Sequence, residues 1–264
     1  MNMIILAAGT GNRLKPITAD RPKCMVPLEG KPLLYWQTNT ARAAGVKNIV
    51  VVRGFCKETV QGEELTFVEN KRFAETNMLQ TLWCAAEYFG DSFIVSYGDI
   101  VYEPSVLEAL LKSPHDISVV VDREWKSYWE KRVDNVLDDA ESLRLADDGR
   151  ITDIGNKETS LERIQAQYIG LLSFKGKSVQ LAKDLFEKER KAHQDGRTLI
   201  STKRNFDMLY MTDFLQGLIN SGTDIHAVPI NEKWLEIDSH RDLELAQKFA
   251  LTSGNTLTIN RNTP

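Results

Sequence analysis

The first residues whose types and spacing could do chemistry lie near the N-terminus. An apolar run from Met3 to Ala7 leads directly into GTGNRLKP, which contains Gly9, Gly11 and Arg13. Glycine adopts backbone angles closed to other residues and lets amide N–H groups approach phosphate oxygens, while arginine offers a planar fork to the same oxygens. This loop is predicted to hold a polyphosphate, and a simple tight turn is the alternative.

Aspartates at the ends of two later runs could hold a metal ion beside such a phosphate. Asp99 follows the apolar run Phe93 to Ser96, and Asp238 lies in KWLEIDSHRDLELAQ, just before a predicted helix. Mg²⁺ prefers one or two carboxylates and keeps its other positions for water and phosphate. Asp99 could instead serve a turn. Asp238 could lie beside a helix cap, because Ser239 and Asp242 form an S-x-x-D capping box.

Several familiar binding patterns are absent from the sequence. There is no G-x-x-x-x-G-K-[ST] loop, and G-T-G-N-R-L has a leucine where the dinucleotide-binding pattern needs its third glycine, so kinase and dehydrogenase interpretations both weaken. Cys24, Cys56 and Cys84 form no C-x-x-C pair, and the histidines form no H-x-x-x-H pair. We therefore expect reduced thiols, and a metal with oxygen ligands.

The segment that follows Met3 extends the glycine loop into a long motif. Its sequence, LAAGTGNRLKPITADRPKCMVPLEGKPLL, closely resembles the signature of the nucleotidyltransferases that make nucleotide-diphosphate sugars and related activated alcohols. In that family the glycine loop wraps the triphosphate, and the lysine of the P-K pair reaches a phosphate of the reacting groups. The resemblance implies catalytic roles for Arg13 and Lys23. It also places Leu6, Ala7, Ala8, Gly9 and Gly11 at the nucleotide.

The same resemblance implies a Mg²⁺ cofactor held by Asp99 and Asp238. The segment of the first aspartate resembles the strand-G-D segment of the family, and that of the second resembles its late W-x-D-[IV]-[DG]-[ST] segment. A phosphate or phosphonate oxygen that attacks the α-phosphorus of a nucleoside triphosphate brings several negative charges together. Such a reaction needs cations and fixed N–H donors more than it needs a general base.

Departures from the sugar-specific members of the family favour another subgroup. E-T-N-M-L-Q-T-L, from Glu75 to Leu82, replaces the usual G-T-A-x-[AS], and the sugar-binding E-K-P is absent. The chain is more similar to the phosphocholine cytidylyltransferases and their phosphonate-using relatives, including those that act on 2-aminoethylphosphonate. That resemblance favours CTP as donor, and it nominates Gly54, Asn77 and Gly98 as nucleotide contacts.

Residues that could bind the acceptor come from the middle of the chain. Lys157, in ITDIGNKE, is expected to face the acceptor phosphate. Trp129 and Tyr168 could offer aromatic faces to a choline-like ammonium, although packing is the usual role of such rings. Arg132 could instead recognise a carboxylate on the acceptor. The expected partners are therefore a nucleoside triphosphate, with CTP preferred, and a small phosphorylated or phosphonate acceptor.

Two other functions stay open at this point. The first is a sugar-1-phosphate nucleotidyltransferase that uses dTTP, UTP or GTP. The second belongs to a different class, a non-catalytic nucleotide-sensing subunit on the same fold. The presence of Arg13, Lys23, Asp99 and Asp238 argues against the second.

The order of predicted elements shows how these residues could be brought together. Short β-branched runs alternate with amphipathic stretches, which is typical of a parallel sheet covered on both faces. Strands are expected at Met3–Ala7, Asn48–Val52, Phe93–Ser96, Asp116–Val121, Tyr168–Phe174 and Ile225–Pro229, and helices at Leu33–Ala44, Met78–Tyr88, Ser105–Lys112, Val179–His193, Phe206–Asn220 and Arg241–Leu251. The fold class predicted is α/β, with a doubly wound, mostly parallel, Rossmann-like sheet.

One region interrupts this alternation. Residues 122–167 are rich in charge and contain only the weaker strand candidates Ser142–Leu145 and Ile151–Ile154, so we expect a small β-containing insertion or lid there that binds the acceptor. Residues 1–250 are expected to form a single nucleotidyltransferase domain. Residues 251–264 are expected to form a polar C-terminal tail that contributes little to the core.

Composition excludes several other classes of protein. The 264 residues carry a formal net charge of -4, which gives no overall positive field to attract nucleic acid or an anionic membrane. The mean hydropathy of -0.32 is ordinary for a globular protein, and the N-terminal apolar run is too short for a membrane span. We expect a cytoplasmic protein with no nucleic-acid or membrane partner, either a monomer or a homodimer.

Overall fold

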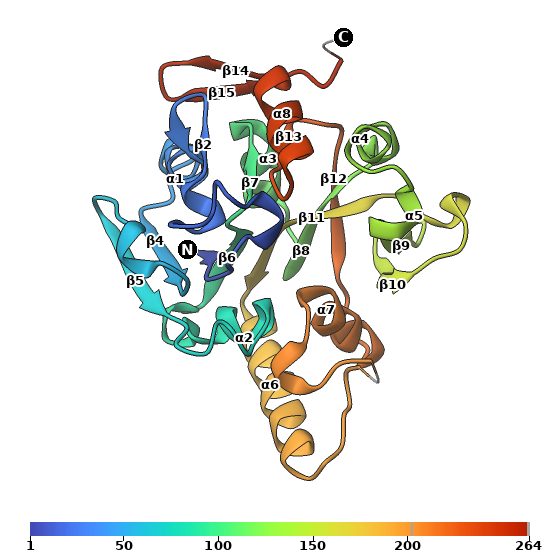
Figure 1. Cartoon of the computed structure of the whole chain (residues 1–264). Helices are drawn as coiled ribbons and strands as arrows, with labels where there is room; N and C mark the ends of the chain where they lie inside the picture. The colour runs from blue at the N-terminus through green and yellow to red at the C-terminus, as the bar shows by residue number, and fades with distance from the viewer. Residues whose placement is uncertain (202, 263–264) are drawn as a thin grey trace.

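The computed structural model describes residues 1–201 and 203–262 and is built around one seven-stranded sheet (Figure 1). In spatial order its strands are β12 (His226–Ile230), β8 (Ile117–Asp122), β11 (Gln167–Lys175), β6 (Ser92–Tyr97), β1 (Asn2–Ala7), β4 (Asn48–Arg53) and β5 (Leu65–Glu69). All neighbouring pairs are parallel except those of β11, which runs antiparallel to both β6 and β8. The predicted α/β, mostly parallel sheet is confirmed.

Helices cover both faces of this sheet, because each central strand is apolar on both sides. Met3 and Ile5 of β1 face one cluster of buried side chains, whereas Ile4 faces the other. The first cluster includes residues of α1 (Leu33–Ala43), α3 (Pro104–Lys112) and α8 (His240–Phe249); the second includes residues of α2 (Met78–Trp83), α6 (Lys177–Gln194) and α7 (Met211–Asn220). The helix expected over Met78–Tyr88 is shorter than predicted. It ends at Trp83, and a 3₁₀ turn, Ala86–Tyr88, follows it.

A two-stranded antiparallel sheet lies beside the carboxyl end of β6. It pairs β7 (Ile100–Tyr102) with β13 (Trp234–Glu236), and the Ile237 amide donates to the Asp99 carbonyl at 2.9 Å. This pairing brings together two segments that are far apart in the sequence. A second short pair, β2 (Pro27–Leu28) and β3 (Lys31–Pro32), forms a tight hairpin before α1.

Residues 123–166 connect β8 to β11 and correspond to the insertion predicted at about 122–167, whose two end residues belong to the central sheet. The two weak strand candidates are real strands, β9 (Glu141–Leu145) and β10 (Ile151–Lys157), and they pair as an antiparallel hairpin. Two helices, α4 (Trp125–Arg132) and α5 (Val136–Asp139), precede this hairpin. In Figure 1 the insertion lies at one side of the molecule, away from α2 and α6.

The C-terminal segment contradicts the expectation of a polar tail with little contribution to the core. It forms a hairpin of β14 (Ala250–Ser253) and β15 (Thr256–Ile259), whose Leu257 and Ile259 join the main hydrophobic cluster. Arg261 is almost completely buried, donates to the Trp234 carbonyl at 2.8 Å and pairs with Asp122 at 2.7 Å. Among the residues described, no helix combines the length and apolar character needed to cross a membrane.

Candidate active site

A cavity of about 330 Å³ opens at the carboxyl ends of β1 and β6. Open α/β sheets bind ligands at this edge. Its lining includes seven of the eight residues predicted at the nucleotide, namely Leu6, Ala7, Ala8, Gly9, Gly11, Asn77 and Gly98, together with Arg13, Lys23, Asp99 and Asp238. The structure therefore brings the loop, the lysine and both aspartates to one place.

Glycine is required in this loop by close packing as well as by backbone angle. Gly11 has φ of +64°, and a Cβ atom there would lie 2.6 Å from Cγ of Lys23. The Thr18 hydroxyl donates to the Gly11 carbonyl at 2.7 Å, which fixes the turn. A side chain at position 11 would therefore displace the loop or Lys23.

Gly54, the eighth residue predicted at the nucleotide, does not line the cavity. It lies behind Phe73, which does line it, and a Cβ atom on Gly54 would come within 2.6 Å of Cβ of Phe73 and 2.7 Å of the Ala8 carbonyl oxygen. Gly54 thus lets Phe73 approach the phosphate loop. Phe73 follows no motif signal in the sequence, so this wall of the cavity was not anticipated.

Lys23 joins the two aspartates that the sequence nominated. Its Nζ donates to Oδ2 of Asp99 at 2.9 Å and also contacts Oδ1 of Asp238, whose Oδ2 pairs with Arg13. The Asp238 side chain is buried, and Oδ1 of Asp99 is buried with no hydrogen-bond partner. Asp99 and Asp238, which are 139 positions apart in the sequence, thus lie together at Lys23. Oδ1 of Asp99 is left without a hydrogen-bond partner there.

This donor set fits Mg²⁺. Within residues 1–201 and 203–262, no group of three or more His, Cys, Asp or Glu side chains could hold a metal. An ion beside Asp99 and Asp238 would therefore take its remaining ligands from water and phosphate, which is how Mg²⁺ binds in phosphate-transfer sites. Oδ1 of Asp99 accepts no hydrogen bond from the protein and is therefore available as a ligand to the ion.

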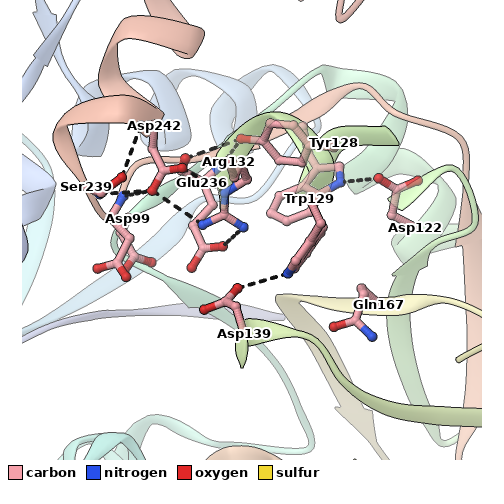
Figure 2. A network of polar contacts seen from close by, with 12 residues as sticks. Asp99, Asp122, Tyr128, Trp129, Arg132, Asp139, Gln167, Glu236, Ser239 and Asp242 are labelled. Atoms are coloured by element: carbon pink, nitrogen blue, oxygen red, sulfur yellow. Dashed lines mark hydrogen bonds and ion pairs between the residues drawn. The ribbon is translucent and has the colours of Figure 1, made fainter. Parts of the chain in front are cut away.

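A network of buried polar contacts holds the backbone around Asp238 (Figure 2). Oδ2 of Asp242 accepts from the amides of Asp238 and Ser239 at 3.1 and 2.9 Å, so the predicted capping box is real. The Tyr128 hydroxyl accepts from the Glu236 amide at 3.1 Å. Side chains from α4 and α8 therefore fix the strand end that carries Asp238.

Arg132 has a different place from the one predicted for it. Its side chain was expected to face the acceptor, but it is buried, with 4% of its surface exposed. Its Nε pairs with Asp242 at 2.8 Å, and its Nη1 pairs with Glu236 at 2.7 Å. It lines neither the cavity described above nor the second cavity beside it. A buried guanidinium with two carboxylate partners supports structure, and it has no free face for a ligand carboxylate.

A second cavity, of about 460 Å³, adjoins the first and shares Arg13, Asn77, Met78 and Tyr97 with it. Three of the four predicted acceptor-binding residues line it, namely Trp129, Lys157 and Tyr168. Residues that the sequence did not suggest also line it, including Asp139, Glu141, Gln167, Arg204, Tyr210, Thr212 and Glu236. They come from the insertion, β11, the segment between α6 and α7, α7 itself and β13, so only the folded chain brings them together.

Burial shifts the pKa values of several groups in the two cavities. It raises the pKa of Glu141 to about 7 and the pKa of Tyr168 well above its ordinary value. Burial, together with the nearby Asp99 charge, raises the pKa of the Cys24 thiol to about 12. Cys24 is therefore a neutral thiol in the wall of the first cavity, which excludes it as a nucleophile.

Comparison with known proteins gives three consistent likenesses. The family described as the MobA-like NTP transferase domain matches residues 3–201. The CTP:phosphoglutamine cytidylyltransferase of Campylobacter jejuni is 35% identical over 256 residues, which cover 93% of this chain and 98% of that protein. The CMP-5'-(3-aminopropyl)phosphonate synthase of Streptomyces rubellomurinus is 32% identical over 128 residues, 46% of this chain and 20% of that protein.

A solved structure confirms the fold. The CTP:phosphocholine cytidylyltransferase of Streptococcus pneumoniae superposes with a TM-score of 0.69 at 21% identity, and the match covers 93% of this chain and 97% of that one. The same mostly parallel sheet with helices on both faces is therefore present in both proteins.

Proposed function

Because the chain belongs to the family of MobA-like NTP transferases and is thus a nucleotidyltransferase, we propose that it is a Mg²⁺-dependent cytidylyltransferase. It transfers CMP from CTP to a small phosphorylated or phosphonate-bearing acceptor and releases pyrophosphate. The observation that carries this proposal is the meeting of two cavities at Arg13, beside Lys23 and the two aspartates. The Campylobacter relative supports CTP as the donor.

The arrangement suits an in-line displacement at the α-phosphorus. An oxygen of the acceptor phosphate forms the new P–O bond as the bond from the α-phosphorus to the pyrophosphate oxygen breaks. Arg13 and Lys23 balance the negative charge that gathers there, and the amides around Gly9 and Gly11 are available to the departing phosphates. Asp99 and Asp238 are the residues that would hold Mg²⁺, which would supply further charge stabilisation to the phosphates.

The two cavities divide the substrates between them. In this proposal the first holds CTP, with Leu6, Ala7, Ala8, Asn77 and Gly98 along its wall, and the second holds the acceptor. Lys157 lies in the second cavity, where its Nζ donates to the Asp138 carbonyl and forms no ion pair with any described residue, so it can also meet an acceptor anion. Trp129 and Tyr168 contribute aromatic faces to the same wall.

Pyrophosphate release tests the proposal directly. The purified protein is incubated with Mg²⁺, with CTP, UTP, dTTP or GTP in turn, and with a panel of phosphorylated amides, phosphorylated alcohols, phosphonates and sugar 1-phosphates. We expect turnover with CTP and a small non-sugar acceptor. Turnover only with sugar 1-phosphates would establish the sugar-specific alternative instead, and CTP binding without turnover on any acceptor would favour a nucleotide-sensing subunit.

A further inference from the structure

The acceptor cavity contains four carboxylates, and among the residues that the structure describes only Glu236 of these four forms an ion pair. Of the other three, Glu141 has a pKa raised by burial. Asp138, Asp139, Glu141 and Glu236 all line it. Asp139 accepts from Nε1 of Trp129 at 2.9 Å, Asp138 accepts from Asn135 at 2.9 Å, and Glu236 pairs with Arg132 at 2.7 Å. Glu141 forms no ion pair with any lysine or arginine that the structure describes.

Neither of the two cations near Glu141, Arg204 and Lys157, forms an ion pair with it in the part of the chain that the structure describes. Nη1 of Arg204 pairs with both oxygens of Asp213 at 2.9 and 3.0 Å, and Nζ of Lys157 donates to the Asp138 carbonyl. Thr212 donates a hydrogen bond to the Glu141 carboxylate, but a hydroxyl does not neutralise its charge. A carboxylate is thus kept in a partly buried cavity without a counter-charge of its own.

The position of Glu141 is fixed by its backbone. The Glu141 amide donates to Oε1 of Gln167 at 3.1 Å, and Nε2 of Gln167 donates back to the Glu141 carbonyl. Gln167 itself is 5% exposed and lies on β11, immediately before Tyr168. The central sheet therefore holds Glu141 in place, as a pre-organised binding group needs.

Aromatic side chains stand beside this carboxylate. The rings of Tyr97 and Tyr168 lie edge to face with their centroids 5.7 Å apart, and both residues line the cavity. The Tyr168 hydroxyl is buried and has no hydrogen-bond partner. An unpaired carboxylate next to aromatic faces is the chemistry that binds a cationic nitrogen.

We propose that the acceptor carries a cationic nitrogen in addition to its phosphate or phosphonate, and that Glu141 is the specificity-determining residue that binds this nitrogen. The inference rests on the proposed function, because that function assigns this cavity to the acceptor. Phosphoglutamine and (3-aminopropyl)phosphonate, which appear in the names of two relatives, each contain an amino group. A bound cation would also offset the burial that raises the pKa of Glu141 to about 7.

The test compares acceptors that differ only in charge. One pair is phosphocholine and its neutral isostere, in which a carbon atom replaces the nitrogen; the other is 3-aminopropylphosphonate and butylphosphonate. The variants are Glu141→Gln, which keeps the shape of the side chain, and Glu162→Gln, which removes the same charge from an exposed position of the insertion. Circular dichroism and CTP binding confirm that each variant is folded.

Wild-type protein is expected to prefer the cationic member of at least one pair. Glu141→Gln should raise KM for that acceptor about tenfold to a hundredfold, the range for loss of a charged hydrogen bond, and leave KM for the neutral isostere within about twofold. Glu162→Gln should behave like wild type. Equal use of both members by the wild type, or an equal rise in both KM values in Glu141→Gln, would overturn the inference.

Two measurements, pyrophosphate release and acceptor binding by calorimetry, distinguish failure of this inference from failure of the proposed function. Pyrophosphate release with a neutral acceptor but no preference for a cationic one would support cytidylyl transfer and refute the role of Glu141. Absence of turnover with any acceptor would refute the proposed function, and the binding of phosphocholine and of its isostere would then be measured directly. Tighter binding of phosphocholine that disappears in Glu141→Gln would still support the inference, and equal binding would end it.

Discussion

Arg132 offers the sharpest test of how the site is held together. Its side chain is 4% exposed and that of its partner Asp242 is 3% exposed, so the Arg132→Met variant would leave a buried carboxylate without its counter-charge. Breaking a buried ion pair in this way costs about 3–5 kcal/mol. Glu236, whose pKa is already raised by burial, would lose its partner as well. We therefore expect a loss of at least about 3 kcal/mol at pH 7.5.

Urea unfolding followed by circular dichroism measures this loss, and pH tests its cause. Burial raises the pKa of Glu236 in the folded state, and losing Arg132 removes the charge that opposes this shift, so stability is lost as pH rises through that pKa. The difference between wild type and variant should therefore be largest above pH 7 and shrink towards pH 5. Adding Asp242→Asn to Arg132→Met should recover part of the loss, because only one of the two carboxylates that lose their partner, Glu236, then remains charged.

A surface pair supplies the matched control. Arg190 pairs with Glu187 on α6 at 2.6 Å, but its side chain is 40% exposed, so Arg190→Met should cost under about 1 kcal/mol. A loss below about 1 kcal/mol in Arg132→Met, or a loss that grows as pH falls, would show that the network around Asp238 does not depend on this buried charge.

The remaining predictions concern catalysis, acceptor binding and the C-terminal hairpin. Lys23→Ala should lower kcat at least about a hundredfold while the protein still folds, and single-turnover kinetics with saturating CTP would check this. Because burial raises the pKa of Glu141 to about 7 and only the ionised form attracts a cation, KM for a cationic acceptor should rise between pH 8 and pH 6. The neutral isostere of that acceptor has the same phosphate group, so its KM should show only the change due to phosphate titration. Arg261→Met should lower stability by about 3–5 kcal/mol, because the Asp122 carboxylate is fully buried with it, and a thermal-unfolding midpoint close to that of wild type would contradict this.

Local pattern was sufficient for most strands and for the place of the glycine loop in the wall of the first cavity. The β-branched runs of β1, β4 and β6 each lie at their expected positions, because a strand buried on both faces must be apolar throughout. The direction of β11 could not be read in the same way. An unbroken apolar run such as Tyr168–Phe174 is compatible with either orientation, and only the topology of the chain decides between them.

The acceptor side of the site shows where sequence reasoning fails. Arg132 is a basic residue in a charged segment, which is the pattern of a solvent-facing or ligand-binding side chain, yet its partners Glu236 and Asp242 come from more than one hundred positions away. Glu141 and Thr212 approach each other across the same cavity from different elements. No local spacing links such residues, so neither the buried ion pair nor the unpaired carboxylate could be anticipated.

The C-terminal hairpin was missed for another reason. Leu257 and Ile259 alternate with threonine and asparagine, which is a strand pattern, but only two apolar residues carry it. Such a short signal is weak beside the surrounding polar residues. Its importance comes from long-range contacts, above all the pairing of Arg261 with Asp122.

That pairing bears on the order in which the protein becomes active during synthesis. Arg261 donates to the carbonyl of Trp234, at the start of the strand whose end leads to Asp238, and it pairs with the end of β8. A nascent chain that has emerged only as far as Asp238 contains every residue of the phosphate site but lacks this clamp. Residue 261 must therefore be synthesised before this contact can hold the segment that leads to Asp238.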